Sequence, residues 1–320
     1  MWGRKEKLRF GALLMRLYRC LSDFHGSARG IALAIGNFDG FHVGHQAVIA
    51  SMQEKAKRLN LESAVMIFEP QPMEFFGKKV PARLFTIRDK LRIFRAAGVD
   101  IVFCMNFTRK FANLTDREFV SMLHAPLNVK SVTVGSQFNF GKAGAYDFAD
   151  LQRCCQQLGI ESSAIPKVED AGVRVSSTLL RSLIAQGDFS TMAKFMGHPY
   201  SISGRVVHGN AIGRTIGFPT ANINLNRRVC PLNGVYAVKV NCSYGTFEGV
   251  ANVGHRPTVA KTLHSLLEVN IFNFNHDLYG QEIEVTFVHK IRDESKFAGL
   301  EQLIAQITQD KERAKYLLTL

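Results

Sequence analysis

The sequence predicts two domains: an α/β domain built on a parallel sheet, then a small antiparallel β-barrel or sandwich with a closing helix. Three observations lead to this prediction. The chain has 320 residues, a usual length for about two domains. In the first half, short apolar segments alternate five times with segments of helical spacing. From Ser201, glycine and proline are frequent and β-branched residues alternate with polar ones, which is typical of antiparallel strands.

The composition restricts the functional classes without choosing one. The net charge of +13 is compatible with nucleic acid, an acidic membrane or phosphate-bearing substrates. No apolar segment reaches the roughly 18 residues expected of a membrane span. The six cysteines show neither a C-x-x-C pair nor zinc-ligand spacing, so we expect free thiols and a cytoplasmic location. Residues 1–29 are basic, and their apolar piece is too short for a secretory signal; a helical extension is expected there, with an organelle transit peptide as the alternative.

Apolar strands and amphipathic helices alternate along the first half. Strands are expected at 31–35, 63–68, 99–105, 129–134 and 160–165. Helices are expected at 42–59, 87–98, 115–123, 151–158 and 177–187. Parallel sheets of this kind bind ligands outside the carboxyl ends of their strands. The loops at those ends carry His42 with His45, Glu69 with Gln71, Gln137 with Phe138, and residues 174–181.

The turn after the first strand carries the most specific motif of this half. It reads Gly36-Asn37-Phe38-Asp39-Gly40 and leads into His42, Gly44 and His45 at the start of a helix. Residues three positions apart share a helical face, and the free N–H groups of a helix start favour anions. Gly44 leaves room for a ligand to approach the backbone. We therefore interpret this stretch as a phosphate site for a nucleotide.

A second anion site is expected at Arg174-Val-Ser-Ser177-Thr178-Leu-Leu-Arg181. Guanidinium groups bind phosphate oxygens in a forked geometry. Taken alone, the stretch is equally compatible with a capped helix start and a solvated arginine face. Its expected position across the strand ends from the two histidines favours the anion site.

The second half has the pattern of an all-β domain that ends in a helix. The boundary is expected near Gly197–Tyr200. Strands are expected at 202–207, 235–241, 246–252, 266–274 and 283–288, followed by a helix at 300–318. A barrel and a sandwich both fit this pattern.

A glycine-rich stretch near the start of this half has two interpretations. Gly209, Gly213 and Gly217 are loop glycines of the kind that let a backbone wrap phosphates. Thr220 and Asn222 offer oxygen atoms, which Mg²⁺ accepts as ligands together with water and phosphate. The spacing by itself favours a plainer interpretation, a glycine-rich hairpin with Asn222 as a turn residue.

Glu268 is the only charged side chain between Lys261 and Asp277. Strand alternation places it on one face with Leu266 and Asn270, which argues against a position in solvent. A carboxylate near a magnesium-bound nucleotide can accept a proton from an attacking hydroxyl.

These motifs are similar to those of the bacterial bifunctional riboflavin kinase/FAD synthetase family, from about Ile31 to Leu318. The first half resembles an HxGH nucleotidylyltransferase with a Rossmann-like parallel sheet. The second half resembles a flavokinase barrel. Beyond the two phosphate motifs, the matching residues are Gly213–Asn222, Asn233–Tyr236, Gly249–Gly254, Leu267–Val269, Tyr279-Gly280 and Arg292–Glu294.

The resemblance implies three segments and two reactions. The segments are a basic N-terminal extension at 1–29, an FMN adenylyltransferase domain at 30–190 and a riboflavin kinase domain at 196–320. The kinase phosphorylates riboflavin to FMN with Mg²⁺ and ATP. The adenylyltransferase joins FMN and ATP into FAD and releases pyrophosphate. FMN and FAD are thus expected as product ligands.

The resemblance also implies a role for individual residues. The implied catalytic residues are His42, His45 and Glu268. Binding of ATP in the adenylyltransferase domain is assigned to Gly36, Asn37, Phe38, Asp39, His42, Gly44, His45, Arg174, Ser177, Thr178 and Arg181. Kinase ATP is assigned to Gly209, Gly213, Arg214, Gly217, Pro219, Thr220 and Asn222. Mg²⁺ is assigned to Thr220 and Asn222, and the flavin to Asn252 and Arg292.

The chain departs from the family pattern at four positions, all in the adenylyltransferase half. Glu69 and Gln71 replace Asp and His, Gln137 replaces Asp or Asn, and Gly144 stands near the place of an Arg. The phosphate motifs are intact, so we expect FAD synthesis to be retained, with a weakened rate left open. The alternative is a riboflavin kinase whose adenylyltransferase domain is inactive but retained for structure.

Two other classes remain for comparison. A nucleic-acid-binding protein would suit the basic charge and the barrel, but the barrel half lacks exposed aromatics interleaved with basic residues. Another HxGH transferase, acting on pantetheine phosphate or a nicotinate nucleotide, would need no flavokinase module. We expect riboflavin, FMN and ATP as partners, without nucleic acid or membrane, and leave a homo-oligomer open.

Overall fold

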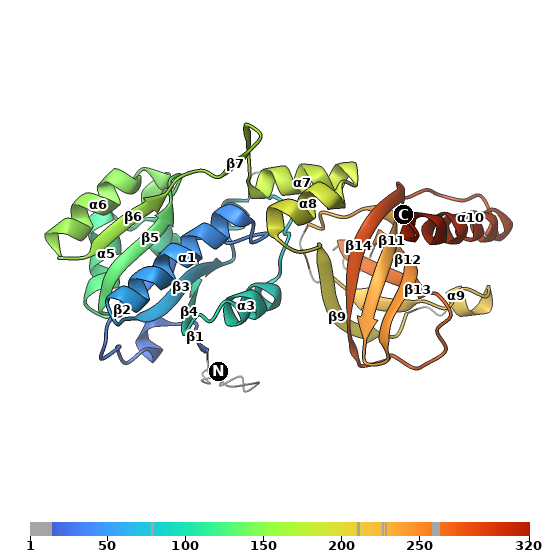
Figure 1. Cartoon of the computed structure of the whole chain (residues 1–320), viewed down its shortest axis with the longest axis horizontal. Helices are drawn as coiled ribbons and strands as arrows, with labels where there is room; N and C mark the ends of the chain where they lie inside the picture. Colours follow the sequence, from blue (N-terminus) through green and yellow to red (C-terminus); the bar gives the residue numbers. More distant parts are fainter. Residues whose placement is uncertain (1–14, 78–79, 210–211, 226, 228, 258–262) are drawn as a thin grey trace. The chain divides into compact units, whose positions relative to one another are not determined.

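The computed structural model describes residues 15–77, 80–209, 212–225, 227, 229–257 and 263–320 (Figure 1). They form two compact units. Unit 1 comprises the described residues of Met1–Pro81 and Ile87–Ser176, and unit 2 comprises those of Ala82–Thr86 and Ser177–Leu320. The division falls after Ser176, and the domain limits at 190 and 196 stay a prediction.

Unit 1 contains a six-stranded sheet in which every neighbouring pair is parallel. The strand order is β1 (Arg16–Tyr18), β4 (Ile101–Asn106), β3 (Glu62–Glu69), β2 (Ile31–Ile35), β5 (Val129–Gly135) and β6 (Glu161–Ile165). The five predicted strands and their parallel arrangement are confirmed.

Strand β1 corrects the prediction of a helical extension for residues 16–18, and residues 1–14 of that extension lie outside the described residues. Residues 16–18 pair in parallel with β4, with Arg16 opposite Ile101. The ring of Tyr18 stacks on Phe103, with centroids 5.8 Å apart, and meets Phe24 edge-on at 5.2 Å. This packing fixes an edge strand that is too short to show alternation in the sequence.

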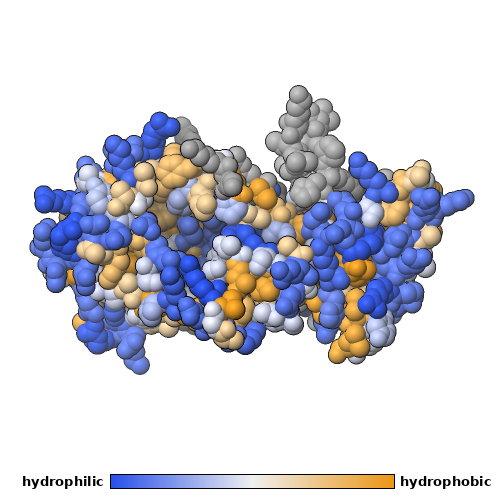
Figure 2. Space-filling view, turned by 90° about the horizontal axis from the view of Figure 1, so that it is seen from above, coloured by the Kyte–Doolittle hydropathy of each residue, from blue (hydrophilic) through white to orange (hydrophobic). Residues whose placement is uncertain are grey.

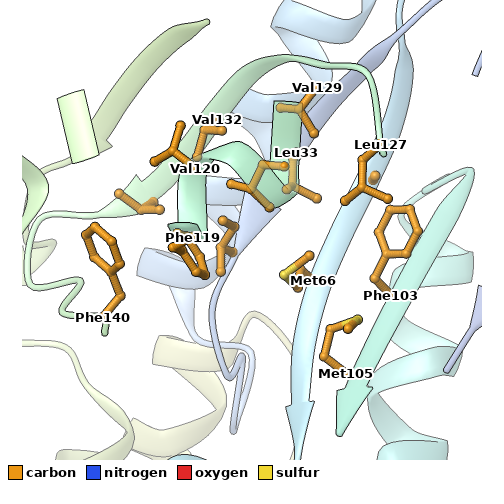
Figure 3. Packing of buried hydrophobic residues seen from close by; sticks show 14 of the residues in the cluster. Leu33, Met66, Phe103, Met105, Phe119, Val120, Leu127, Val129, Val132 and Phe140 are labelled. Atoms are coloured by element: carbon orange, nitrogen blue, oxygen red, sulfur yellow. The ribbon is translucent and has the colours of Figure 1, made fainter. Parts of the chain in front are cut away.

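Helices cover both faces of the sheet (Figure 1). The helices of unit 1 are α1 (Val43–Arg58), α2 (Pro72–Phe76), α3 (Ile87–Ala96), α4 (Arg109–Ala112), α5 (Asp116–His124) and α6 (Phe148–Gln157), of which α1, α5 and α6 contact the strands most extensively. Figure 3 shows Leu33, Met66 and Phe103, from three neighbouring strands, in one apolar cluster with Phe119 and Val120 of α5. Helix α1 packs against β2 and β5. The predicted helices are confirmed, as is the capping box in which Thr115 accepts a hydrogen bond from Glu118 N–H (3.2 Å).

Unit 2 contains a closed six-stranded barrel, so the barrel rather than the sandwich is confirmed (Figure 1). The strand order is β10 (Ala221–Asn224), β13 (Leu263–Ile271), β12 (Gly245–Pro257), β11 (Gly234–Cys242), β14 (Glu282–Arg292) and β9 (Ser201–Val207). All pairs are antiparallel, and β10 closes the barrel against β9. The helices are α7 (Ser177–Gln186), α8 (Phe189–Met196), α9 (Ile212–Thr215) and α10 (Leu300–Leu318).

Strand β10 corrects the interpretation of Asn222 as a turn residue. Asn222 pairs with Glu268 of β13 and with Val207 of β9. The next residue, Ile223, is almost fully buried. This segment is therefore a strand that lies between two others in the barrel. The glycines that precede it obscured the strand pattern in the sequence.

Two helices seal the barrel. Phe189 of α8 packs on the rings of Tyr200, Tyr236 and Phe287. Helix α10 lies across the outer face of β11, β12 and β14, with Ala314 in an apolar cluster that includes Val235, Val250 and Phe272. The surface view in Figure 2 shows mainly hydrophilic side chains with separate hydrophobic patches.

Candidate active sites

The turn after β2 is supported by an aromatic residue beneath it. Phe38 is buried, and its ring meets Phe94 of α3 edge-on with centroids 5.5 Å apart. Phe38, Gly40 and Phe41 all have positive φ, at 50°, 82° and 37°. Gln46 Nε2 donates a hydrogen bond to Phe41 O (3.0 Å). These contacts stabilise a tight turn that leads directly into α1.

The two histidines meet at that helix start. His42 is the N-cap residue of α1, and its ring stacks on His45 with centroids 3.8 Å apart and 20° between the planes. The Nδ1 atoms of both rings are buried and have no hydrogen-bond partner. A Cβ at Gly44 would lie 3.1 Å from the His42 ring, so the absence of a side chain at this position leaves room for the ring. Unpaired buried ring nitrogens are suited to a polar ligand.

The surroundings keep both imidazoles neutral. Burial lowers the pKa of His42 to about 4, assisted by the Arg174 charge and opposed by Asp39. Burial also lowers the pKa of His45 well below its usual value, with contributions from His42 and Lys90. Neutral imidazoles beside cationic groups leave a site whose electrostatics favour an anion.

Lys90 is a residue that sequence reasoning missed. Its side chain is buried in α3, and its charge acts on His45. A signal was present, since Lys90 lies in the helical stripe formed by Ile87, Leu91 and Phe94. A lysine in an apolar stripe is rarely buried unless another group compensates its charge.

The predicted second anion site divides between the two units. Arg174 lies in the short strand β8 (Val173–Arg174), which pairs with β7 (Glu169–Asp170), and its charge acts on His42. Ser177, Thr178 and Arg181 lie in α7, which belongs to unit 2. There Arg181 Nε donates to Ala82 O (2.6 Å). The structure thus places Arg174 within electrostatic range of His42, and the role of the other three stays a prediction.

The four departures from the family pattern lie in distinct surroundings. Glu69 ends β3, and Gln71 is the buried N-cap residue of α2 with Nε2 unpaired. Gln137 is exposed in the loop after β5. Gly144 has φ +67°, a conformation that side-chain-bearing residues rarely adopt. An arginine at position 144 would therefore be strained in this loop.

An exposed apolar group lies at the carboxyl ends of β3 and β4, and sequence reasoning did not single it out. Met73 and Phe76 of α2 are 57% and 55% exposed. The rings of Phe75 and Phe76 meet Phe107 at 5.4 and 5.9 Å. Exposed apolar surface beside a polar site is a common feature of sites for planar ligands. The Phe75-Phe76 pair after the proline-rich loop was the available signal.

In unit 2, the strand register aligns the predicted kinase residues in one row around the barrel. Asn222 lies opposite Glu268, and Glu268 lies opposite Asn252. Val235 lies opposite Asn252 on one side and Arg292 on the other. Directly opposed residues project from the same face of a sheet. The row is therefore on the face that α10 covers, where Val235 packs.

Asn222 has an oxygen that is suited to a metal ligand. The side chain is 5% exposed, and its Oδ1 atom has no hydrogen-bond partner. Its Nδ2 atom donates to Thr220 O (3.3 Å). A Cβ at Gly209 would lie 2.5 Å from Asn222 Nδ2, so the Gly209 backbone lies directly against this amide. Nearby, Asn270 Nδ2 donates to Pro219 O (2.8 Å) and fixes the loop before β10.

Thr220 lines two pockets. One has a volume of about 620 Å³ and is lined by Pro219, Thr220 and the 274–279 segment, with Tyr279 stacked on His208 at 3.8 Å. The other has a volume of about 350 Å³ and is lined by Thr220, Asn252, Glu268 and Arg292, together with Gly213. Gly217 has φ +83°. The Arg214 side chain lies outside the described residues.

Two negative observations hold for the part of the chain that the structure describes. Within it, no helix combines the length and the apolar character that a membrane crossing requires. Within it also, no group of three or more His, Cys, Asp or Glu side chains is arranged to hold a metal ion. All six cysteines are free thiols.

Comparison with known proteins covers both halves of the chain. The family model of FAD synthetase matches residues 25–179, and that of riboflavin kinase matches residues 196–318. The bifunctional riboflavin kinase/FMN adenylyltransferase of Escherichia coli K12 is 46% identical over 305 residues, covering 94% of this chain and 97% of the relative. The Haemophilus influenzae protein of the same description is 46% identical over 304 residues, covering 94% and 98%.

A solved structure is similar over the same range. It is described as a macrolide-efflux protein from Streptococcus pneumoniae, with 31% identity and a TM-score of 0.76. The match covers 93% of this chain and 98% of that one. The two family models follow each other in the same order as the two compact units. The chain therefore belongs to the bifunctional riboflavin kinase/FMN adenylyltransferase family.

Proposed function

We propose that the chain phosphorylates riboflavin to FMN in unit 2 and adenylylates FMN to FAD in unit 1. The observation that carries the proposal is the presence of two separate sets of phosphate-site residues, one in each unit. The histidine pair with Arg174 belongs to unit 1, and the Asn222, Glu268 and Asn252 row belongs to unit 2. Identity to bifunctional relatives over 94% of the chain supports the same assignment.

In the kinase reaction, ATP occupies the larger pocket, and riboflavin occupies the smaller one, which Asn252, Glu268 and Arg292 line; Thr220 lines both. The 5′-hydroxyl oxygen of the ribityl chain attacks the γ-phosphorus of ATP. Its proton passes to the Glu268 carboxylate, the bond from the γ-phosphorus to the bridging oxygen breaks, and ADP leaves. Gly209 and Gly217, together with Gly213 and Arg214 of α9, hold the ATP phosphates.

The donor set beside Glu268 fits Mg²⁺. The buried Oδ1 atom of Asn222 has no protein partner, and Thr220, which lines both pockets, contributes a hydroxyl. Mg²⁺ commonly takes one or two protein oxygens and completes its shell with water and phosphate. When bound, the ion would neutralise charge on the ATP phosphates. Asn252 and Arg292 also line the riboflavin pocket.

In the adenylyltransferase reaction, an FMN phosphate oxygen attacks the α-phosphorus of ATP. The bond from that phosphorus to the bridging oxygen breaks, and pyrophosphate leaves. His42 and His45 donate N–H groups to phosphate oxygens as charge develops. Arg174 holds the nucleotide, and the Gly36–Asp39 turn lines its site. The exposed apolar surface of Met73 and Phe76 supports the flavin ring.

A flavin product profile tests the proposal. The purified protein is incubated with Mg-ATP and riboflavin, and separately with Mg-ATP and FMN, and the flavins are separated. FAD from both reactions is the expected result. FMN from riboflavin, without FAD from either reaction, would favour the kinase-only alternative, for which the comparisons offer no support. No turnover of either flavin would refute the proposal.

The remaining parts of the proposal concern location and partners. Six free thiols support the proposed cytoplasmic location. The two reactions use riboflavin, FMN and ATP, and we propose neither nucleic acid nor membrane as a partner. Light scattering of the purified chain decides whether it forms a homo-oligomer.

A further inference from the structure

We propose that Asp310 is a positioning residue for riboflavin, acting through Arg292 in the wall of the smaller pocket. The inference rests on the proposed kinase reaction and adds a residue from the closing helix to it. Asp310 lies in the middle of α10, and both it and Arg292 line the 350 Å³ pocket beside Asn252 and Glu268.

The contact between Asp310 and Arg292 is a forked ion pair. Arg292 Nε donates to Asp310 Oδ1 (3.0 Å) and Oδ2 (3.1 Å), and Nη2 donates to Oδ2 (2.7 Å). The Asp310 residue is only 4% exposed. Gln306 Nε2 donates a further hydrogen bond to Asp310 Oδ1 (3.0 Å). These donors fix the orientation of the buried Asp310 carboxylate, because a bidentate pair with a guanidinium group is geometrically specific.

The other edge of the guanidinium holds the segment after β14. Arg292 Nη1 donates to Asp293 O (2.9 Å) and to Ser295 Oγ (3.3 Å). The group also lies 5.6 Å from the centre of the Phe297 ring. Ser295 and Phe297 line the same pocket. Arg292 therefore ties β14, the 293–297 segment and α10 together at the pocket wall.

This arrangement separates the pocket wall from the reacting groups. Most N–H groups of Arg292 already donate hydrogen bonds to Asp310, Asp293 and Ser295. The main role of this arginine in the pocket is therefore to hold its wall in place, and few of its N–H groups remain for a ligand. The reacting groups, Thr220, Asn222 and Glu268, belong to β13 and to β10 with its preceding loop. Loss of Asp310 should therefore weaken riboflavin binding and leave the chemical step and the ATP site largely unchanged.

The test is the Asp310→Asn variant in the full chain, assayed for FMN formation with riboflavin and Mg-ATP varied separately. We expect the riboflavin KM to rise about tenfold, because small displacements of positioning groups have large effects. The ATP KM and kcat should stay within about threefold. Asp310→Glu keeps the carboxylate and should restore part of the riboflavin affinity.

Glu312→Gln is the matched control. Glu312 lies on the same helix, its side chain is 64% exposed, and it pairs with Lys315 (2.7 Å) away from the pocket. The Glu312→Gln substitution removes one carboxylate and should leave the riboflavin KM, the ATP KM and kcat unchanged. Thermal unfolding reports whether each variant is folded, and FAD formation from FMN in unit 1 serves as the reference activity.

The outcomes distinguish this inference from the proposed function. If the wild-type chain makes no FMN, the proposed function fails. If it does, an unchanged riboflavin KM in a folded Asp310→Asn variant overturns the inference, as does an equal rise in both KM values. Should that variant not fold, Arg292→Lys decides: it keeps the charge and loses the fork, and an unchanged riboflavin KM there overturns the inference equally.

Discussion

A single added methyl group at Gly209 should disable the kinase site selectively. The backbone of Gly209 lies outside the positive-φ region, so alanine is compatible with it. Its Cβ would lie 2.5 Å from Nδ2, 2.8 Å from Cγ and 2.9 Å from Oδ1 of Asn222. Ordinary contacts begin near 3.4 Å, so the amide must move by about 0.9 Å.

That displacement sets the expected magnitude. A misplacement of about 1 Å in a catalytic group can reduce the rate by about 100-fold, which corresponds to about 2.7 kcal/mol in the activation free energy. We therefore expect Gly209→Ala to lower kcat for riboflavin phosphorylation by about 100-fold. It should also raise the Mg²⁺ concentration at half-maximal rate, because Asn222 Oδ1 is the proposed ligand.

The assay is FMN formation at saturating riboflavin, with Mg²⁺ varied at fixed ATP. FAD formation from FMN serves as an internal reference, because its site lies in unit 1. Gly299→Ala is the matched control, since a Cβ there meets nothing within 4 Å and φ is −165°. A folded Gly209→Ala protein with unchanged kcat and Mg²⁺ dependence would refute the proposed role of Asn222.

Three further predictions concern single groups. Glu268→Gln should lower riboflavin phosphorylation by about 10²- to 10⁴-fold, the usual contribution of a general base, and leave FMN adenylylation unchanged. His42→Asn should abolish FAD formation from FMN while FMN formation from riboflavin continues, which product separation measures. The third prediction concerns pH. The pKa of His42 is about 4 when folded and 6.5 when unfolded, so the unfolded chain binds the proton more readily. Stability is therefore present above pH 6.5 and is lost as pH falls toward 4, by about 2 kcal/mol between pH 7.5 and 5. Urea unfolding should show a smaller loss in His42→Asn, and an equal loss would contradict the burial of this imidazole.

The sequence by itself determined the order and type of most elements. Apolar periodicity is a local property, so five parallel strands, the α10 span at 300–318 and the change to an all-β pattern could be predicted. The histidine pair was predicted as a unit, because its residues are three positions apart on one helix. The chemistry that these motifs suggested agrees with the family to which the chain belongs.

Only the tertiary structure decided where distant residues meet. Strands β1 and β10 are too short to show alternation, and their partners lie far along the chain, as with Ile223 and Leu267. Lys90 became significant only when its helix packed beside His45. The row of Asn222, Glu268 and Asn252 follows from strand register, which pairing sets across the whole barrel. The Arg292–Asp310 pair joins a strand to a helix, and no local pattern in the sequence encodes that contact.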